Sequence, residues 1–134
     1  MTPWQRLSRR VDRAVNAPPE HRDELLHAAR KAAKQARYAA EACRRAYDTA
    51  AEHLAAQAEA VQELLGEHQD SVVTAQLLRD LAEQAYQQGE DTLSYGVLIA
   101  REEERARAAE ARFAPVWHRA SAKKHRAWLH RDGT

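Results

Sequence analysis

The sequence has few of the residues that form turns, sheets and cross-links. Among 134 residues there are four glycines, four prolines and one cysteine, and aromatic residues make up 6%. The glycines lie far apart, which excludes a glycine-rich phosphate-binding loop, and the single Cys43 excludes an internal disulfide. A β-sandwich, a glycine-rich nucleotide-binding α/β fold and a disulfide scaffold are therefore disfavoured, and a reducing cytoplasm is the expected setting.

Long apolar runs and catalytic motifs are also missing. No stretch approaches the ~20 apolar residues of a transmembrane helix, and the N-terminus lacks the apolar segment of a signal peptide, so no membrane association is expected. There is no His-Glu-x-x-His motif, no cysteine pair and no evident pairing of a nucleophile with a base. We therefore expect no enzyme activity, no catalytic residue, no metal and no cofactor.

Alanine and charged residues, by contrast, are abundant. Alanine accounts for 29 of the 134 residues, and charged residues make up 31%. Because alanine, arginine, glutamate and glutamine favour helices, we predict an all-α fold, an antiparallel bundle of four to five helices with long second and fifth helices. In this prediction residues 1–121 form a single helical domain. Residues 122–134 form a basic, partly disordered C-terminal tail whose last residues are mobile.

Apolar spacing and helix-ending residues predict the extents of the helices. The expected helices cover residues 3–16, 20–47, 49–65, 70–89 and 92–120. Gly66 is expected to cap the third helix, and Asp70 the fourth. On the fourth helix the residues expected to point inward are Val73, Leu77, Leu81 and Ala85.

The formal net charge of +1 conceals an uneven distribution. Residues 1–45 carry a net charge of +6, residues 46–94 carry −9, and residues 95–134 carry +4. Clustered charge of one sign creates a field that attracts a polyanion. Pairing of helices through complementary charge is the structural alternative, and the charges alone leave it open.

The second predicted helix separates basic from apolar side chains. At 100° per residue, one face carries His27, Arg30, Lys31, Lys34, Arg37 and Tyr38. The opposite face carries Leu25, Ala28, Ala29, Ala32, Ala33, Ala36, Ala39, Ala40, Cys43 and Tyr47. No acid lies within the basic stripe, and like charges at this spacing repel by roughly 0.2–0.5 kcal/mol per pair. Since arginine and lysine bind phosphate groups, the stripe favours an anionic, phosphate-rich ligand, although the stripe alone leaves a purely structural role open.

Further arginines are candidates for secondary binding. Those on the first helix are Arg6, Arg10 and Arg13, and those on the fifth are Arg101, Arg105, Arg112 and Arg119. The fifth helix also carries Glu102, Glu103, Glu104 and Glu110. Local ion pairing therefore explains its arginines as well as ligand binding does.

Two motifs resemble a known family. Residues 26–41, LHAARKAAKQARYAAE, resemble the His-x-x-Arg-Lys-x-x-Lys-x-x-Arg-Tyr-x-x-Glu signature of CHAD domains (conserved histidine α-helical domains). Residues 61–70, VQELLGEHQD, resemble that family's Leu-Gln-x-x-Leu-Gly-x-x-x-Asp turn, with Val61 in the first leucine position. The resemblance implies an all-α domain that binds inorganic polyphosphate without catalysis. It also implies a cytoplasmic location in association with polyphosphate granules.

The resemblance assigns roles position by position. Polyphosphate binding is implied for His27, Arg30, Lys31, Lys34 and Arg37, and architectural roles for Tyr38, Glu41, Gly66 and Asp70. The resemblance covers residues 5–120 and only the C-terminal half of a CHAD domain. Residues 7–13 match only part of the His-x-x-Arg-Val-x-x-Arg-Arg helix of the first half, and they lack its histidine.

The missing half leaves the assembly open. Either two copies pair as a homodimer to rebuild a closed channel, or the site is an open groove, or the chain is a decayed or truncated fragment. The alanine-rich surface that a half-domain leaves exposed favours the homodimer. Two alternatives to polyphosphate also stay open. One is a helical module that binds nucleic acid or polyanions in general, which the lack of interleaved aromatic residues disfavours. The other is a structural half-domain that docks on a partner protein.

Overall fold

The computed structural model is built from helices. It describes residues 1–130, with the backbone alone described at residues 45, 47 and 130. The elements are α1 (Pro3–Val15), α2 (Pro19–Ala42), α3 (Arg44–Gln87), α4 (Leu93–Ala120) and two short 3-10 helices, η1 (Lys123–His125) and η2 (Ala127–His130). Residues 1–130 contain no strand, so the all-α prediction is confirmed. The predicted mobility of the last residues concerns positions 131–134, which lie outside the described residues.

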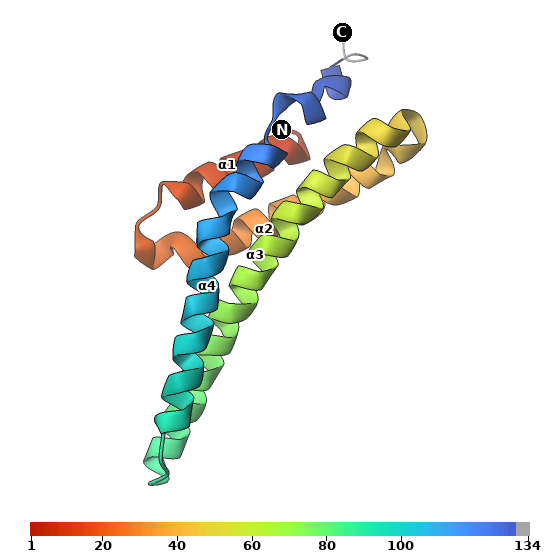
Figure 1. Ribbon diagram of the computed structural model, residues 1–134. Helices are drawn as coiled ribbons and strands as arrows, with labels where there is room; N and C mark the ends of the chain where they lie inside the picture. The colour runs from red at the N-terminus through yellow and green to blue at the C-terminus, as the bar shows by residue number, and fades with distance from the viewer. Residues whose placement is uncertain (131–134) are drawn as a thin grey trace.

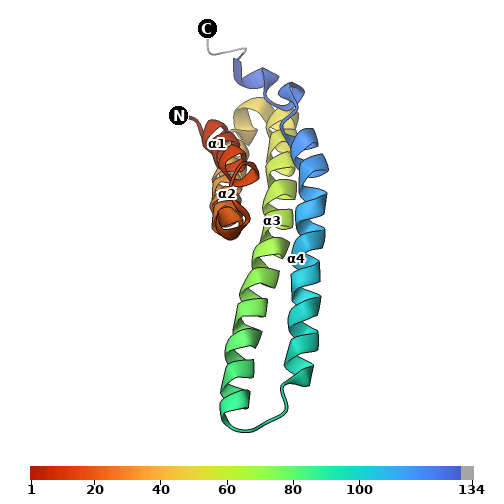
Figure 2. The same cartoon turned by 90° about the vertical axis from the view of Figure 1, so that its left-hand side faces the viewer.

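The long antiparallel hairpin of α3 and α4 organises the molecule. Each helix packs chiefly against the next in sequence, α1 on α2, α2 on α3 and α3 on α4. Figures 1 and 2 show α1 and α2 beside the half of the hairpin that holds the start of α3 and the end of α4. The other half, around the α3–α4 turn, extends beyond them as two helices. Within the described residues no helix is long and apolar enough to cross a membrane.

Helix α1 begins and ends within one residue of the predicted bounds, and α2 begins where the sequence predicts, but α2 ends at Ala42 and not at the predicted residue 47. Thr2 caps α1, because its hydroxyl oxygen accepts a hydrogen bond from the Gln5 backbone N–H at 3.1 Å, while the Gln5 side-chain oxygen accepts from the Thr2 backbone N–H at 2.9 Å. Asn16 ends α1, and Pro19 occupies the first position of α2, where proline needs no backbone donor.

The core lies where α1, α2 and the first part of α3 meet. The apolar side chains of α1 that recur at helical spacing, Trp4, Leu7, Val11 and Ala14, are all buried there. The alanine face of α2 is also buried, at Ala29, Ala32, Ala33, Ala36 and Ala40. Its small side chains let α1 and α3 approach on either side. The buried leucine of α2 is Leu26, whereas Leu25, the expected one, is half-buried. Tyr47 lies outside the described side chains.

The predicted division of α3 at Gly66 is wrong. The helix continues through Gly66 and Asp70, so neither residue caps a helix. One break comes at Cys43, before the predicted end of the second helix, and another at Asp48, between the predicted second and third helices, where the backbone has φ 44° and ψ −108°. Asp48 thus adopts a positive φ, a conformation that aspartate tolerates better than most residues. A glycine inside a helix costs about 1 kcal/mol relative to alanine, and packing against neighbouring helices offsets that cost.

The inward orientation predicted for the second half of α3 is also wrong at three residues. Val73, Leu77 and Leu81 are 54%, 56% and 38% exposed. The buried residues here are alanines, Ala75 at 3% and Ala85 at 4% exposed. This part of α3 packs against α4 alone, and the alanines line the contact between the two helices. The larger side chains therefore point away from it.

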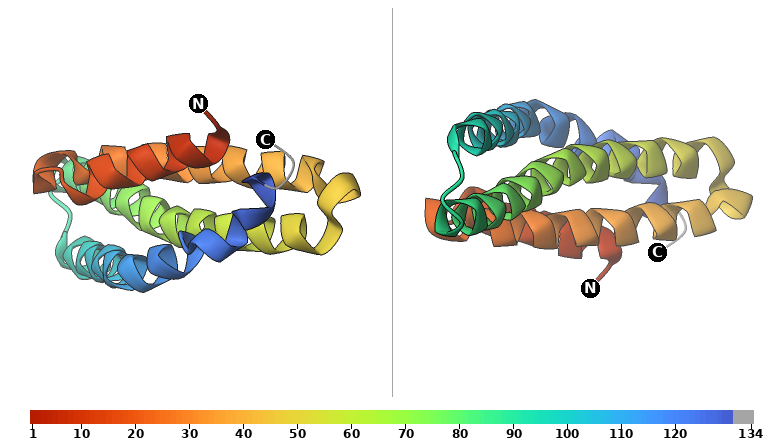
Figure 3. Two further views of the ribbon diagram at one scale, coloured as in Figure 1. Left: turned by 90° about the horizontal axis from the view of Figure 1, so that it is seen from above. Right: turned by 90° about the horizontal axis from the view of Figure 1, so that it is seen from below.

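The segment after α4 folds back onto the bundle. The helix continues through Pro115 to Ala120, and η1 and η2 follow. Figures 1 and 3 place this segment and the N-terminus at the same end of the molecule. The Trp128 side chain is buried, and the Arg126 guanidinium lies 4.9 Å from the ring centre of Trp4. Residues 123–130 are thus part of the packed structure.

Candidate functional site: a basic face on α2

The predicted basic residues lie along one face of α2. Lys31 and Lys34 are exposed, while His27, Arg30 and Arg37 are half-buried. Among the residues that the structure describes, no ion pair joins Arg30, Lys31 or Lys34 to a carboxylate. These three residues therefore form a row of cations whose charge the described part of the protein does not neutralise. We call them the cationic row.

Arg30 lies against α3 at Gly66. A Cβ atom at position 66 would stand 3.4 Å from Nε of Arg30, at the edge of ordinary van der Waals contact. Gly66 is itself buried, in the middle of a continuous helix. The structure therefore gives Gly66 a spatial role beside the cationic row instead of the predicted cap.

Tyr38 lies at the other end of the same face. Its ring centre is 5.8 Å from Nζ of Lys34 and 5.1 Å from Cζ of Arg37. A cation over an exposed aromatic ring contributes about 0.5–1 kcal/mol. Tyr38 is 44% exposed, so it holds the two cationic side chains near one another while remaining at the surface.

Arg37 differs from the cationic row because acidic and polar groups surround it. Its guanidinium lies 3.3 Å from the Glu41 carboxylate and 3.9 Å from that of Glu59, and Nη1 donates a hydrogen bond to Oε1 of Gln62 at 3.0 Å. Glu59 and Gln62 belong to α3. The structure thus places Arg37 in the contact between α2 and α3, with its charge already compensated.

His27 is not a fifth cation at neutral pH. Burial, followed by the positive charges of Lys31 and Arg30, lowers the pKa of the His27 imidazole below its usual 6.5. Its Nδ1 atom is buried and has no hydrogen-bond partner. His27 is therefore neutral at pH 7, because the nearby positive charges of Lys31 and Arg30 oppose its protonation in the absence of a bound anion.

Two of the arginines that are candidates for secondary binding form ion pairs with glutamates. Arg105 contacts Glu102 at 2.8 Å, and Arg112 contacts Glu67 of α3 at 3.1 Å. Ion pairing therefore explains these two arginines. Of the other candidates, four are exposed, namely Arg6, Arg13, Arg101 and Arg119, and Arg10 is half-buried. Asp70 is exposed and lines the same surface groove as Arg105 and Arg112.

Comparison with known proteins identifies the family. The CHAD domain family matches residues 3–79, which include α1, α2 and most of α3. The chain belongs to the CHAD domain family. The match contains the whole cationic row together with Gly66 and Asp70, and it ends before α4.

Two curated relatives of this CHAD domain come from Mycobacterium tuberculosis. They are Uncharacterized protein Rv2226 of strain H37Rv and Uncharacterized protein MT2285 of strain CDC 1551 / Oshkosh. Each is 45% identical over 86 residues, which is 64% of this chain and 16% of the relative. The chain therefore spans only a small part of the length of these relatives. No solved structure matches the chain.

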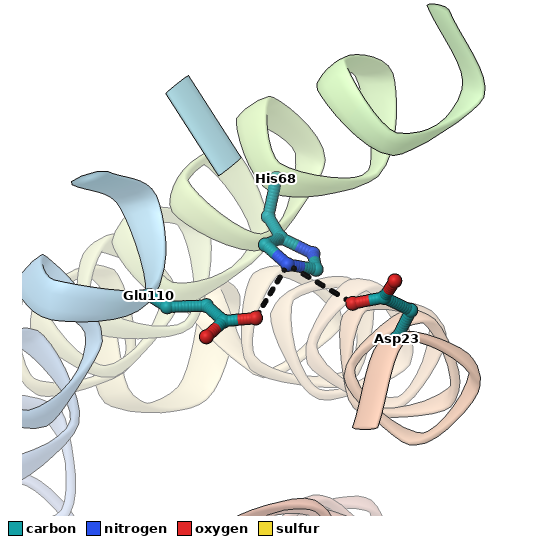
Figure 4. A group of neighbouring side chains, drawn as sticks. All are labelled: Asp23, His68 and Glu110. Carbon is teal, nitrogen blue, oxygen red and sulfur yellow. Dashed lines mark hydrogen bonds and ion pairs between the residues drawn. The ribbon is translucent and has the colours of Figure 1, made fainter. Parts of the chain in front are cut away.

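The protein also contains a polar cluster that no sequence motif predicts. His68 of α3 is 2% exposed, and its Nε2 atom lies 3.0 Å from Oε1 of Glu110 and 3.4 Å from Oδ1 of Asp23. Figure 4 shows the two carboxylates pointing at the histidine ring from α2 and α4. The three residues are far apart in sequence, so no local spacing reveals the cluster. The one available signal is that His68 shares the buried face of α3 with Leu64 and Leu65.

Proposed function

We propose that this CHAD domain binds inorganic polyphosphate and does not catalyse a reaction on it. The cationic row carries the proposal, because Arg30, Lys31 and Lys34 share one helix face without an acidic partner in the described part of the chain. An oligomeric phosphate presents a series of anionic groups to such a row, and the bound cations release counterions. Membership of the CHAD family supports this ligand, and with it a cytoplasmic location at polyphosphate granules.

The side chains on this face distinguish polyphosphate from nucleic acid as the proposed ligand. Arginine binds phosphate through two parallel hydrogen bonds, and lysine binds it as a point charge. Single-stranded nucleic acid would in addition use aromatic rings as stacking platforms. Tyr38 is the aromatic residue on this face, and its ring already contacts Lys34 and Arg37. This arrangement favours polyphosphate over nucleic acid.

The test is a titration of the protein with long-chain polyphosphate at about 50 and 200 mM salt. Single-stranded DNA of equal total charge is titrated in parallel. The Arg30→Glu/Lys34→Glu variant is expected to lose binding. The control, Lys123→Glu/Lys124→Glu, changes the net charge equally at two exposed residues of η1 and is expected to retain it. Circular dichroism confirms that both variants keep their helical content.

Each other outcome identifies a different function. Equal affinity for DNA and polyphosphate would favour a general polyanion-binding module. Equal losses in both double variants would mean that net charge, and not the cationic row, determines binding. Absence of binding at low salt would contradict the proposal and favour a structural module that docks on another protein.

We also propose that two copies of the chain pair through the half of the α3–α4 hairpin that α1 and α2 leave uncovered. This half carries exposed apolar side chains on α3, at Val73 and Leu77, and on α4, at Leu93 and Val97. Its charges are partly satisfied within the chain, since Arg79 pairs with Glu103 across the hairpin. A two-fold axis places one such apolar face against the identical face of a second copy, which buries both.

The molecular mass in solution tests the pairing. Analytical ultracentrifugation is expected to show a dimer of the 15.2-kDa chain that dissociates on dilution. Leu77→Glu is expected to give a monomer, whereas Lys123→Glu, far from the hairpin turn in sequence, is expected to leave the dimer intact. A wild-type protein that remains monomeric at high concentration would contradict the pairing without affecting the polyphosphate proposal.

A further inference from the structure

The cluster of Asp23, His68 and Glu110 joins three helices at one point. Asp23 lies near the start of α2, His68 in the middle of α3, and Glu110 in the second half of α4. One potential ligand atom from each residue lies within 4.8 Å of the other two. As Figure 4 shows, all three side chains converge on the space beside Nε2 of the histidine.

Hydrogen bonding alone accounts poorly for this arrangement. Nε2 of His68 can offer one proton, yet two carboxylate oxygens lie 3.0 and 3.4 Å from it. The only other cation paired with the cluster in the described chain is Arg22, whose Nη1 lies 3.8 Å from Oε2 of Glu110. Nδ1 of His68 is buried without a hydrogen-bond partner, so the ring itself is incompletely satisfied. Two carboxylates therefore converge on a buried ring with little positive charge to offset them.

The distances fit a shared metal ion. Nitrogen and oxygen ligands lie about 2.0–2.2 Å from zinc, and two of them at angles of roughly 90–110° are about 3.0–3.4 Å apart. The observed separations from Nε2 to the two carboxylate oxygens are 3.0 and 3.4 Å. The three ligand atoms lie within 4.8 Å of one another, so a cation beside Nε2 would be within reach of all three and would neutralise the two carboxylates.

The ligand types indicate which class of ion binds. One imidazole nitrogen with two carboxylate oxygens suits zinc and neighbouring divalent transition metals. Calcium and magnesium prefer sites built from oxygen ligands. Asp23 is 53% exposed and Glu110 32% exposed, so an ion can enter from solvent on their side, and a water molecule can complete its coordination. His68, at 2% exposed, fixes the inner side of the site.

We propose that Asp23, His68 and Glu110 bind one divalent transition-metal ion of the zinc class that links α2, α3 and α4. The ion would fix the start of α2 against the hairpin. His27 follows Asp23 by about one helical turn, so the site lies just before the basic face on the same helix. The proposal does not depend on polyphosphate binding, and its tests use the metal alone.

Calorimetric titration of chelator-treated protein with zinc sulfate tests the site. We expect one equivalent bound per chain and a higher melting temperature in the presence of zinc. Cobalt(II) serves as a second probe, because its visible absorption reports coordination by the protein. Asp23→Asn and Glu110→Gln keep the size of each side chain and are each expected to weaken binding by about 10-fold or more. Both variants keep the buried His68, so they should disturb the fold less than a substitution of the histidine would.

Two controls separate this site from others. Glu104→Gln changes an α4 carboxylate that pairs with Arg107 and is expected to bind zinc normally. His118→Gln/His125→Gln removes two histidines near the end of α4 and is also expected to leave binding unchanged. Unaltered affinity in both cluster variants, or loss of affinity in the double histidine variant alone, would overturn the proposal. Absence of binding by the wild-type protein to both zinc and cobalt would overturn it as well.

Discussion

Arg30 of α2 lies directly against Gly66 of α3, where a Cβ atom would stand 3.4 Å from the arginine Nε. The glycine occupies a buried position inside a long helix, where it lowers helix stability by about 1 kcal/mol relative to alanine. The close approach of Arg30 accounts for the glycine at position 66, because a larger side chain there would occupy the space of the Arg30 side chain. It also links the family's second motif to the cationic row of the first.

Enlarging residue 66 is therefore expected to weaken polyphosphate binding. Gly66→Leu should displace the Arg30 guanidinium and reduce affinity about as much as Arg30→Gln does. Gly66→Ala adds only one carbon at the limit of contact, so it should retain affinity and raise the free energy of unfolding by up to about 1 kcal/mol. Titration with polyphosphate and urea unfolding measure the two effects.

Gly96 of α4 provides the matched control. Apart from its chain neighbours and the adjacent backbone of α4, no described atom lies within 4 Å of a Cβ at that position, so Gly96→Leu should leave polyphosphate affinity unchanged. If Gly66→Leu binds polyphosphate as well as the wild-type protein does, the close approach of Arg30 has no part in binding.

The salt dependence of binding should reflect three cations. Arg37 is paired with Glu41 and Glu59, and His27 is neutral at pH 7, which leaves Arg30, Lys31 and Lys34. At about 0.7 per phosphate contact on a single strand, the slope of log K against log salt is expected to be about −2 for each chain. Titrations over a series of salt concentrations measure this slope.

Single substitutions separate the contributions to the slope. Arg30→Gln should make it shallower by about 0.7, whereas Arg37→Gln should leave it nearly unchanged and instead weaken the contact between α2 and α3. An equal change in slope for both variants would show that Arg37 leaves its carboxylate partners to bind the ligand.

Polyphosphate affinity should rise as the pH falls below neutrality. Burial, with the charges of Lys31 and Arg30, lowers the pKa of His27 in the unliganded protein. A bound polyanion raises that pKa, so binding is coupled to proton uptake in the range between the two values. We therefore expect tighter binding near pH 6 than near pH 7.5, and a weaker pH dependence in His27→Gln. His21→Gln, which alters an exposed histidine on the same helix, is the control. Titrations in buffers of different ionisation enthalpy measure the proton uptake.

His27 should also make the free energy of unfolding depend on pH, but this free energy should fall on acidification, whereas polyphosphate affinity rises. Because its folded-state pKa lies below 6.5, the unfolded chain takes up its proton first as the pH falls. The contribution of neutral His27 is complete above about pH 6.5 and is lost as the pH falls below that value. Urea unfolding without ligand should therefore show a smaller loss of stability on acidification in His27→Gln than in the wild-type protein.

Local sequence patterns predicted the fold class, the extent of α1 and the start of α2, but not the end of α2 at Ala42. Apolar residues at helical spacing are sufficient for this, and Pro18 and Pro19 mark the junction between the helices. The continuity of α3 was not predictable in the same way. Gly66 is a residue that commonly ends helices, and its compatibility with this one depends on packing between helices that sequence spacing does not describe.

The candidate site was predictable to a similar extent. Spacing at 100° per residue placed the basic side chains of α2 on one face, but it does not show which charges are already paired. The pairing of Arg37 depends on Glu59 and Gln62, which lie on another helix. The same limit applies to His68, whose contacts with Asp23 and Glu110 form only after three helices pack together.

The contact between the distal halves of α3 and α4 supplies the last prediction. Ala75 is 3% exposed in that contact, whereas Leu77 is 56% exposed, although leucine is the more apolar residue. Ala75→Leu should overpack the contact and lower the free energy of unfolding by about 1–3 kcal/mol. Leu77→Ala should change it by less than about 0.5 kcal/mol in dilute protein, where the chain is monomeric. Urea unfolding at low concentration measures both values. A large loss for Leu77→Ala under these conditions would mean that Leu77 packs within its own chain, whereas a loss seen only in concentrated protein would mean that it packs against a second copy.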